Sequence, residues 1–199
     1  MTDATHPVVS DDGEELILVD GNGNPVGFRS KAECHRGEGL LHLAFSVFLF
    51  DGRNRLLIQR RSPAKPLWGG FWSNSCCSHP RRGETVQAAA HRRLREELGL
   101  DAGLQELFSF RYHAAFGEAG SERELCHVLV GRTDRTACPN RNEVAELRWV
   151  TPSELDREMA EDPHRFTPWF LMEWPRVRAW LQAGTPRDPE AEPTSRRSR

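Results

Sequence analysis

Three pairs of residues in this sequence carry side chains that can do chemistry. Cys77 and His79 stand two residues apart, and nearby charge or metal can tune such a thiol to act as an acid or a base. Glu122 and Glu124 have the same spacing, which places both carboxylates on one face of a strand. Two like charges there call for a metal ion, a basic partner or exposure to solvent, and exposure is the simplest expectation.

Arg93 and Glu97 form the third pair. They lie four residues apart on a predicted helix, and an ion pair on the helix surface explains that spacing without any further role. Loops of the N-terminal half add Lys31, Arg61 and Lys65. If these cations converge with Arg93, they can neutralise a diphosphate, and Glu97 can hold the Mg²⁺ that bridges its oxygens.

Histidine and cysteine give weaker signals. His35, His42 and His79 lie in polar or strand-edge positions, but their wide spacing is a weak indication of a metal site. The five cysteines include the adjacent Cys76 and Cys77 and no pair spaced as CxxC, so neither a disulfide framework nor a zinc ribbon fits. A reducing compartment is favoured, and these patterns do not decide which of the two adjacent thiols is reactive.

These side chains need strands and one central helix to position them. Alternation over residues 41–50 predicts a strand with His42 on the face opposite its apolar row. Residues 72–83 are expected as a polar loop, followed by a helix from about Glu84 to Leu98 that Gly99 ends in a left-handed cap. Paired strands are predicted at 104–115 and 123–132. The remaining predictions are a hairpin at 15–28, a short turn or helix at 31–35, strands at 55–60 and 147–150, and helices starting near residues 151 and 167.

Composition indicates one globular domain. The chain has 199 residues, of which 38% are hydrophobic, and 27 Lys and Arg against 29 Asp and Glu give a net charge of −2. That balance favours neither nucleic acid nor an anionic membrane as a partner, and no apolar run is long enough to cross a bilayer. We predict a cytoplasmic protein with a disordered segment at 1–12, a domain at 13–183 and a disordered tail at 184–199.

The segment from Gly83 to Leu100 resembles the signature of the Nudix superfamily. The resemblance implies an α+β fold, with a mixed β-sheet core flanked by helices in a single domain. Two positions depart from the signature: Ser78 stands where a glycine is usual, and Arg93 where a glutamate is usual. The second change removes a metal-binding carboxylate, which argues against pyrophosphate hydrolysis.

A closer resemblance, over about residues 16–181, is to the type I isopentenyl-diphosphate delta-isomerase family. It is carried by His35 with residues 41–46, and by residues 68–80, 111–112, 122–124 and 166–169. The family pattern Asn-Ser-x-Cys-x-His-Pro aligns its catalytic thiol with Cys77.

The resemblance implies an isomerase of a small-molecule substrate that moves a double bond by protonation and deprotonation through a tertiary carbocation. Cys77 and Glu124 would be the acid and base, with Tyr112 supporting Glu124 and the indole of Trp169 stabilising the cation. A Mn²⁺ or Zn²⁺ ion would be bound by His35, His42, His79, Glu122 and Glu124. Mg²⁺ would be held by Glu97 and the substrate, whose diphosphate would be bound by Lys31, Arg61, Lys65 and Arg93.

Two other functions compete with this interpretation. A Nudix hydrolase of a nucleoside diphosphate derivative would share the helix and Mg²⁺, but it needs more carboxylates and an activated water. A non-catalytic module would hold a structural zinc through Cys76, Cys77 and His79. A monomer is the default expectation for the oligomeric state.

Overall fold

The computed structural model describes residues 7–184, and the predictions for residues 1–6 and 185–199 lie outside this range. The strands are β1 (Glu15–Val19), β2 (Pro25–Ser30), β3 (His42–Phe50), β4 (Leu56–Arg61), β5 (Trp72–Ser73), β6 (Cys76–Ser78), β7 (Leu104–Ala115), β8 (Ser121–Arg132) and β9 (Val144–Val150). The α-helices are α1 (Lys31–His35), α2 (Val86–Leu98), α3 (Pro152–Glu161) and α4 (Pro168–Gln182). Short 3₁₀ turns occupy Gly117–Ala119 and Pro163–Arg165.

Strand β3 is the centre of the sheet. It pairs antiparallel with β1, β4 and β6 and parallel with β8, so the sheet is mixed. This pairing sets His42 beside Glu124 and Ser46 beside Cys77, although these residues are far apart in the sequence. Strand β7 then pairs along the outer side of β8, and β9 pairs with β4.

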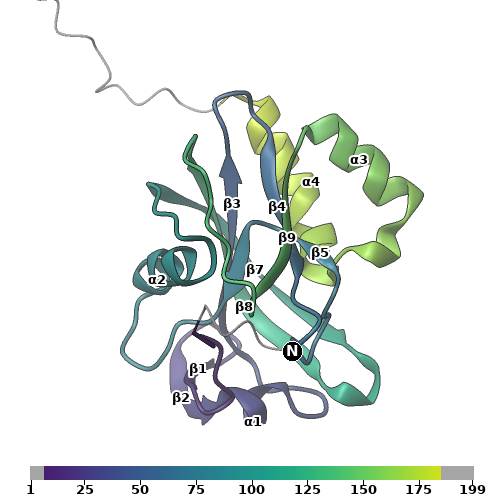
Figure 1. The fold of residues 1–199 in the computed structure, drawn as a ribbon. Coiled ribbons are helices and arrows are strands. Elements are labelled where there is room, and N and C mark those ends of the chain that lie inside the picture. Colours follow the sequence, from purple (N-terminus) through teal and green to yellow (C-terminus); the bar gives the residue numbers. More distant parts are fainter. Residues whose placement is uncertain (1–6, 185–199) are drawn as a thin grey trace, which may run out of the picture.

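Two apolar cores cover the two faces of β3, as its alternating pattern requires. Phe45, Val47 and Leu49 pack with the apolar side of α2. Phe48 and Phe50 point the other way and pack with α3 and α4. Figure 1 shows α2 on one side of the sheet and α3 and α4 on the other. The predicted α+β class, with a mixed sheet flanked by helices, is confirmed.

The ends of the helices follow local chemistry. The Thr85 side chain accepts a hydrogen bond from the Ala88 N–H at the start of α2, and Gly99 closes the helix with φ 62°, which confirms the predicted left-handed cap. Helix α4 continues through Pro175. Among residues 7–184, no helix combines the length and apolar character needed to cross a bilayer.

Some predicted boundaries were wrong. Cys76–Ser78 forms a short strand instead of part of a polar loop, because β3 offers it a partner in register. Strand β9 starts at Val144, three residues before the predicted start, because β4 pairs with it along its length.

The segment ahead of β1 contacts the domain: the carbonyl of Val9 accepts a hydrogen bond of 2.9 Å from Arg93.

Candidate active site

A cavity of about 320 Å³ opens beside β3, β6 and β8. Its wall contains eleven of the thirteen residues predicted as site residues. The other two, His42 and Glu97, lie behind the wall, and each contacts a residue that forms it. The predicted residues lining the cavity are Lys31, His35, Arg61, Lys65, Cys77, His79, Arg93, Tyr112, Glu122, Glu124 and Trp169.

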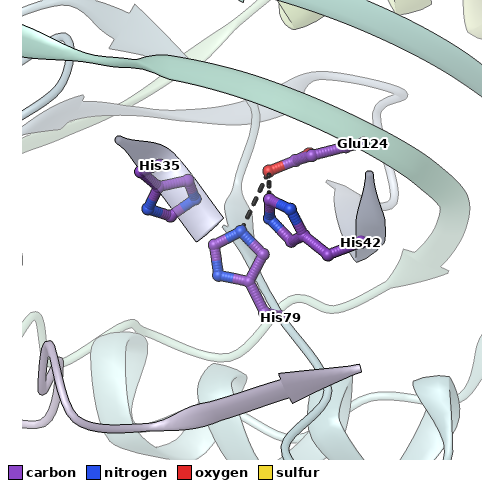
Figure 2. A group of neighbouring side chains, drawn as sticks. All are labelled: His35, His42, His79 and Glu124. Carbon is purple, nitrogen blue, oxygen red and sulfur yellow. Dashed lines mark hydrogen bonds and ion pairs between the residues drawn. The ribbon is translucent and has the colours of Figure 1, made fainter. Parts of the chain in front are cut away.

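Three imidazoles and a carboxylate lie together beside the cavity, and Figure 2 shows how these four side chains point toward one another. The ring centroids of His35, His42 and His79 lie 4.9 to 5.1 Å apart. Oε1 of Glu124 is 2.9 Å from Nε2 of His79 and 3.7 Å from Nε2 of His42. One ligand atom from each of the four residues lies within 4.8 Å of the others, so the group can hold a metal ion.

The chemistry of these donors fits a divalent metal. Burial lowers the pKa of His42 to about 4, and it also lowers the pKa of His35 and His79, so all three rings are neutral at pH 7. The Nδ1–H of His42 donates to the carbonyl of Leu40 at 2.7 Å, which leaves the Nε2 lone pair free to bind metal. Within residues 7–184, buried nitrogens of all three rings lack a hydrogen-bond partner: Nε2 of His35, Nε2 of His42 and Nδ1 of His79.

Glu122 and Glu124 are both buried, so the expectation that they face solvent is wrong. The hydroxyl of Tyr112 lies 2.8 Å from Oε2 of Glu124 and 3.0 Å from Oε2 of Glu122, and it therefore ties the two carboxylates together. Burial and the neighbouring charge of Glu122 raise the pKa of Glu124 well above its ordinary value. Glu122 lies outside the group of four that can hold the metal, so its predicted role as a fifth ligand stays a prediction.

The two adjacent cysteines have different surroundings. Cys76 is fully buried in the core beneath α2, as expected of a structural thiol. Cys77 points to the other face of β6 and lines the cavity. Nη1 of Arg61 lies 3.4 Å from its sulfur. Burial raises the pKa of the Cys77 thiol while the Arg61 charge opposes that effect, so the thiol holds its proton.

The four predicted anion-binding cations share the cavity wall, but two are held by carboxylates. Arg93 and Glu97 form the predicted ion pair, with 2.5 Å between Nη2 and Oε1. Their side chains are only 3% and 1% exposed, so a surface ion pair is the wrong description. Lys65 bonds Glu143 at 2.5 Å, and Glu143 also lies 3.3 Å from Arg93.

Trp169 closes the apolar part of the cavity. Its indole N–H donates to Oγ of Ser73 at 3.1 Å and to Oδ1 of Asn74 at 3.2 Å, which fixes the ring. The guanidinium carbon of Arg61 lies 5.2 Å from the ring centroid, so this ring already contacts one cation. No role was predicted from the sequence for three residues of the site: Asn74, which holds the Trp169 ring, Ser46, which lines the cavity, and Glu143, which pairs with Lys65 and Arg93. Ser46 could have been found, because it shares the alternating face of β3 with His42. Glu143 lies in a loop without a motif.

Known proteins resemble this chain in sequence and in fold. The model of the NUDIX domain matches residues 40–170. An isopentenyl-diphosphate Delta-isomerase of Nocardia farcinica is 50% identical over 154 residues, which are 77% of this chain and 88% of that protein. Isopentenyl-diphosphate Delta-isomerase 2 of Photorhabdus laumondii is 45% identical over 157 residues, 79% of this chain and 88% of the relative. The crystal structure of DR0079 from Deinococcus radiodurans matches with a TM-score of 0.62 at 28% identity, over 74% of this chain and 90% of that one.

The mixed sheet, the helix α2 and the matched region define a protein of the Nudix superfamily. Within this superfamily, the two isomerases named above are 45 to 50% identical to this chain over more than three quarters of its length. The chain belongs to the type I isopentenyl-diphosphate delta-isomerase family.

Proposed function

We propose that this protein converts isopentenyl diphosphate to dimethylallyl diphosphate by a 1,3-allylic proton shift. The observation that carries the proposal is the joint presence, in one cavity, of the Cys77 thiol, the Tyr112-linked carboxylate pair and four cations. An alkene isomerase needs an acid and a base around the carbon skeleton, and a diphosphate substrate needs cations at the other end. The cavity offers both.

The diphosphate would be bound at the cationic side of the cavity. Lys31, Arg61, Lys65 and Arg93 line this wall, and ammonium and guanidinium groups form charge-assisted hydrogen bonds to phosphate oxygens. Mg²⁺ accompanying the diphosphate would be held by Glu97, whose carboxylate lies beside Arg93. In this binding mode Arg93 binds substrate at the position where the Nudix signature has a metal-binding glutamate.

Proton transfer would then take place at the five-carbon unit. One group adds a proton to the terminal methylene carbon, which leaves positive charge on the tertiary carbon. The other removes a proton from the methylene next to it on the diphosphate side, and the double bond forms there. We assign these two roles to Cys77 and Glu124. The Tyr112 hydroxyl can donate to an ionised Glu124 or accept from a protonated one, so it supports Glu124 in both states.

Trp169 would protect the carbocation. Its buried indole lines the cavity, and an aromatic face stabilises a desolvated cation by about 2 kcal/mol. Its bulk also excludes water, which would otherwise capture the cation as an alcohol.

The group of three histidines and Glu124 would hold Mn²⁺ or Zn²⁺, and Glu122 is proposed as the fifth ligand. When bound, the ion would supply positive charge that sets the orientation and the protonation state of Glu124. We also propose that the enzyme works as a monomer in the cytoplasm on a small-molecule substrate.

The decisive experiment follows isopentenyl diphosphate in D₂O by NMR, with Mg²⁺ and Mn²⁺ present. We expect deuterium in the allylic product and in recovered substrate. Cys77→Ala and Glu124→Gln should each lower the rate by about 10²- to 10⁴-fold, the usual contribution of a positioned acid or base. The matched control is Cys76→Ala, which changes the neighbouring thiol on the opposite face of β6. Wild-type rates in either of the first two variants would refute the role assignment.

The hydrolase alternative makes the opposite prediction for this substrate and needs a second assay with nucleotide substrates. It expects phosphate release from nucleoside diphosphate derivatives and no deuterium in the five-carbon compound. The structural-zinc alternative expects Cys77→Ala to lower the melting temperature more than the activity.

A further inference from the structure

Glu143 is placed where it can organise the cations that line the cavity. It lies immediately before β9 and is 2% exposed. Its Oε2 atom lies 2.5 Å from Nζ of Lys65 and 3.3 Å from Nη2 of Arg93. Both of these cations line the cavity wall, whereas Glu143 does not. A single carboxylate oxygen therefore joins two wall cations from behind.

The backbone around Glu143 is fixed at three points. Its carbonyl accepts a hydrogen bond of 2.9 Å from the Ser62 N–H, and its own N–H donates to Asn140 at 3.0 Å. The N–H of Asn140 in turn donates to the carbonyl of Glu97 at 2.8 Å. The carboxylate is thus tied to the end of β4 and to the C-terminal turn of α2, the elements that carry the neighbouring parts of the site.

A buried carboxylate at this position counters two costs of anion binding, the flexibility of the cationic side chains and the repulsion between them. Lysine and arginine side chains have several rotatable bonds, and ordering them when an anion binds opposes binding. Lys65 and Arg93 also carry like charges, which repel when both are directed into one cavity. The carboxylate of Glu143 reduces that repulsion and holds both heads in place. Burial opposes ionisation of Glu143, but the charges of Lys65 and Arg93 lower its pKa to about 2, so the carboxylate is ionised at pH 7.

We propose that Glu143 is a positioning residue for diphosphate binding: it holds Lys65 and Arg93 toward the cavity without touching the substrate. This inference rests on the proposed function, because it takes the cationic wall as the diphosphate subsite. A positioning role and a simple effect of charge predict opposite changes in diphosphate affinity when Glu143 is replaced. Removing a negative charge near an anion should tighten binding, whereas removing a positioning group should weaken it.

The test measures binding of inorganic pyrophosphate by calorimetry in the presence of Mg²⁺, for the wild type, Glu143→Gln and Glu143→Asp. The first variant removes the charge, and the second keeps the charge but withdraws the carboxylate. We expect affinity for pyrophosphate to fall about tenfold in Glu143→Gln, the loss typical of one charge-assisted hydrogen bond, and to fall in Glu143→Asp as well. The KM for isopentenyl diphosphate should rise by the same factor while kcat changes less.

Glu146→Gln is the matched control. It removes a glutamate of β9 that pairs with Arg60 at 3.2 Å on the surface, and it should leave both quantities unchanged. Melting temperatures show whether each variant is folded at the assay temperature, and the charge-retaining Glu143→Asp provides the test if Glu143→Gln is not. Pyrophosphate binding that is equal to or tighter than that of the wild type in the folded variants overturns the proposal. If the wild type binds pyrophosphate but does not isomerise the substrate, the proposed function fails while the role of Glu143 is still decided by calorimetry.

Discussion

Replacing Glu173 should change how stability depends on pH. This residue of α4 is fully buried, and its Oε1 atom accepts a hydrogen bond from the Cys126 thiol at 3.4 Å. Its Oε2 atom has no hydrogen-bond partner within the described part of the chain. Burial raises the pKa of Glu173 to about 8, although hydrogen bonds from Ser46 and Cys126 favour the ionised form. The carboxyl is therefore protonated in the folded protein at pH 7.

The sign of the effect follows from proton binding. Between the ordinary pKa of 4.5 and about 8, the folded protein keeps a proton on Glu173 that the unfolded chain has released. The contribution of this group to stability is therefore fully present below pH 4.5, and it is lost as the pH rises toward 8. Each tenfold difference in proton affinity is worth about 1.4 kcal/mol. Relative to its value below pH 4.5, the free energy of unfolding is therefore lower by about 1 kcal/mol at pH 5, about 3 kcal/mol at pH 7 and about 5 kcal/mol at pH 9.

Glu173→Gln has nearly the same shape as the protonated side chain and does not titrate. We expect its free energy of unfolding to exceed that of the wild type by an amount that grows from pH 5 to pH 9. Urea unfolding at pH 5, 7 and 9, with a chelator in every sample, measures the difference. All other titrating groups are present in both proteins and cancel. If the two proteins instead show the same dependence of unfolding free energy on pH over this range, Glu173 does not have a raised pKa.

Three further predictions concern the active site. Tyr112→Phe removes the hydroxyl that lies 2.8 Å from Glu124, and kcat for isomerisation should fall by about 10- to 100-fold with little change in KM. Gly120→Ala would place a Cβ 2.3 Å from the carbonyl oxygen of His35 at φ 138°, so it should lower the free energy of unfolding by about 2 kcal/mol or more and weaken metal retention. Chelation should abolish activity, and Mn²⁺ or Zn²⁺ should restore it together with one bound ion per chain.

A control or a contradicting result can be stated for each of these three predictions. Gly21→Ala, where the added Cβ would meet no atom within 4 Å, should leave stability within about 0.5 kcal/mol of the wild type. Far-UV circular dichroism of Tyr112→Phe should match the wild type, and an unchanged kcat would remove Tyr112 from the mechanism. Full activity after elemental analysis shows no bound metal would remove the ion from the reaction.

Local patterns predicted much of the framework. The alternation over residues 41–50 placed His42 on the face opposite the row of Phe45, Val47 and Leu49. The structure bears out this alternation, because those three residues pack in one core while Ala44 packs in the other. The two-residue spacing of Glu122 and Glu124 put both carboxylates on one face, where Tyr112 reaches both. These predictions hold because strand and helix geometry repeats every two to four residues. The face on which a side chain lies therefore depends only on its spacing from nearby residues.

Burial and long-range proximity were decided by the tertiary structure. The same spacing of Glu122 and Glu124 allowed exposure to solvent, but in the folded chain both are buried in a cavity wall that they share with Tyr112. The Arg93–Glu97 ion pair was predicted from its spacing. The sequence did not show that this pair would be buried beside Glu143, the residue immediately before β9.

From the amino-acid sequence we could name the residues able to do chemistry and most of the helix and strands that carry them. The family resemblance added the prediction that Cys77, and not Cys76, is the catalytic thiol. The folded chain was needed to show that ligand atoms of His35, His42, His79 and Glu124 lie within 4.8 Å of one another. It was also needed to show that the Glu143 carboxylate contacts both Lys65 and Arg93. The direction of a side chain follows from the backbone near it, which local sequence patterns predict. Its electrostatic partners and its exposure to water depend on segments that only the folded chain brings together.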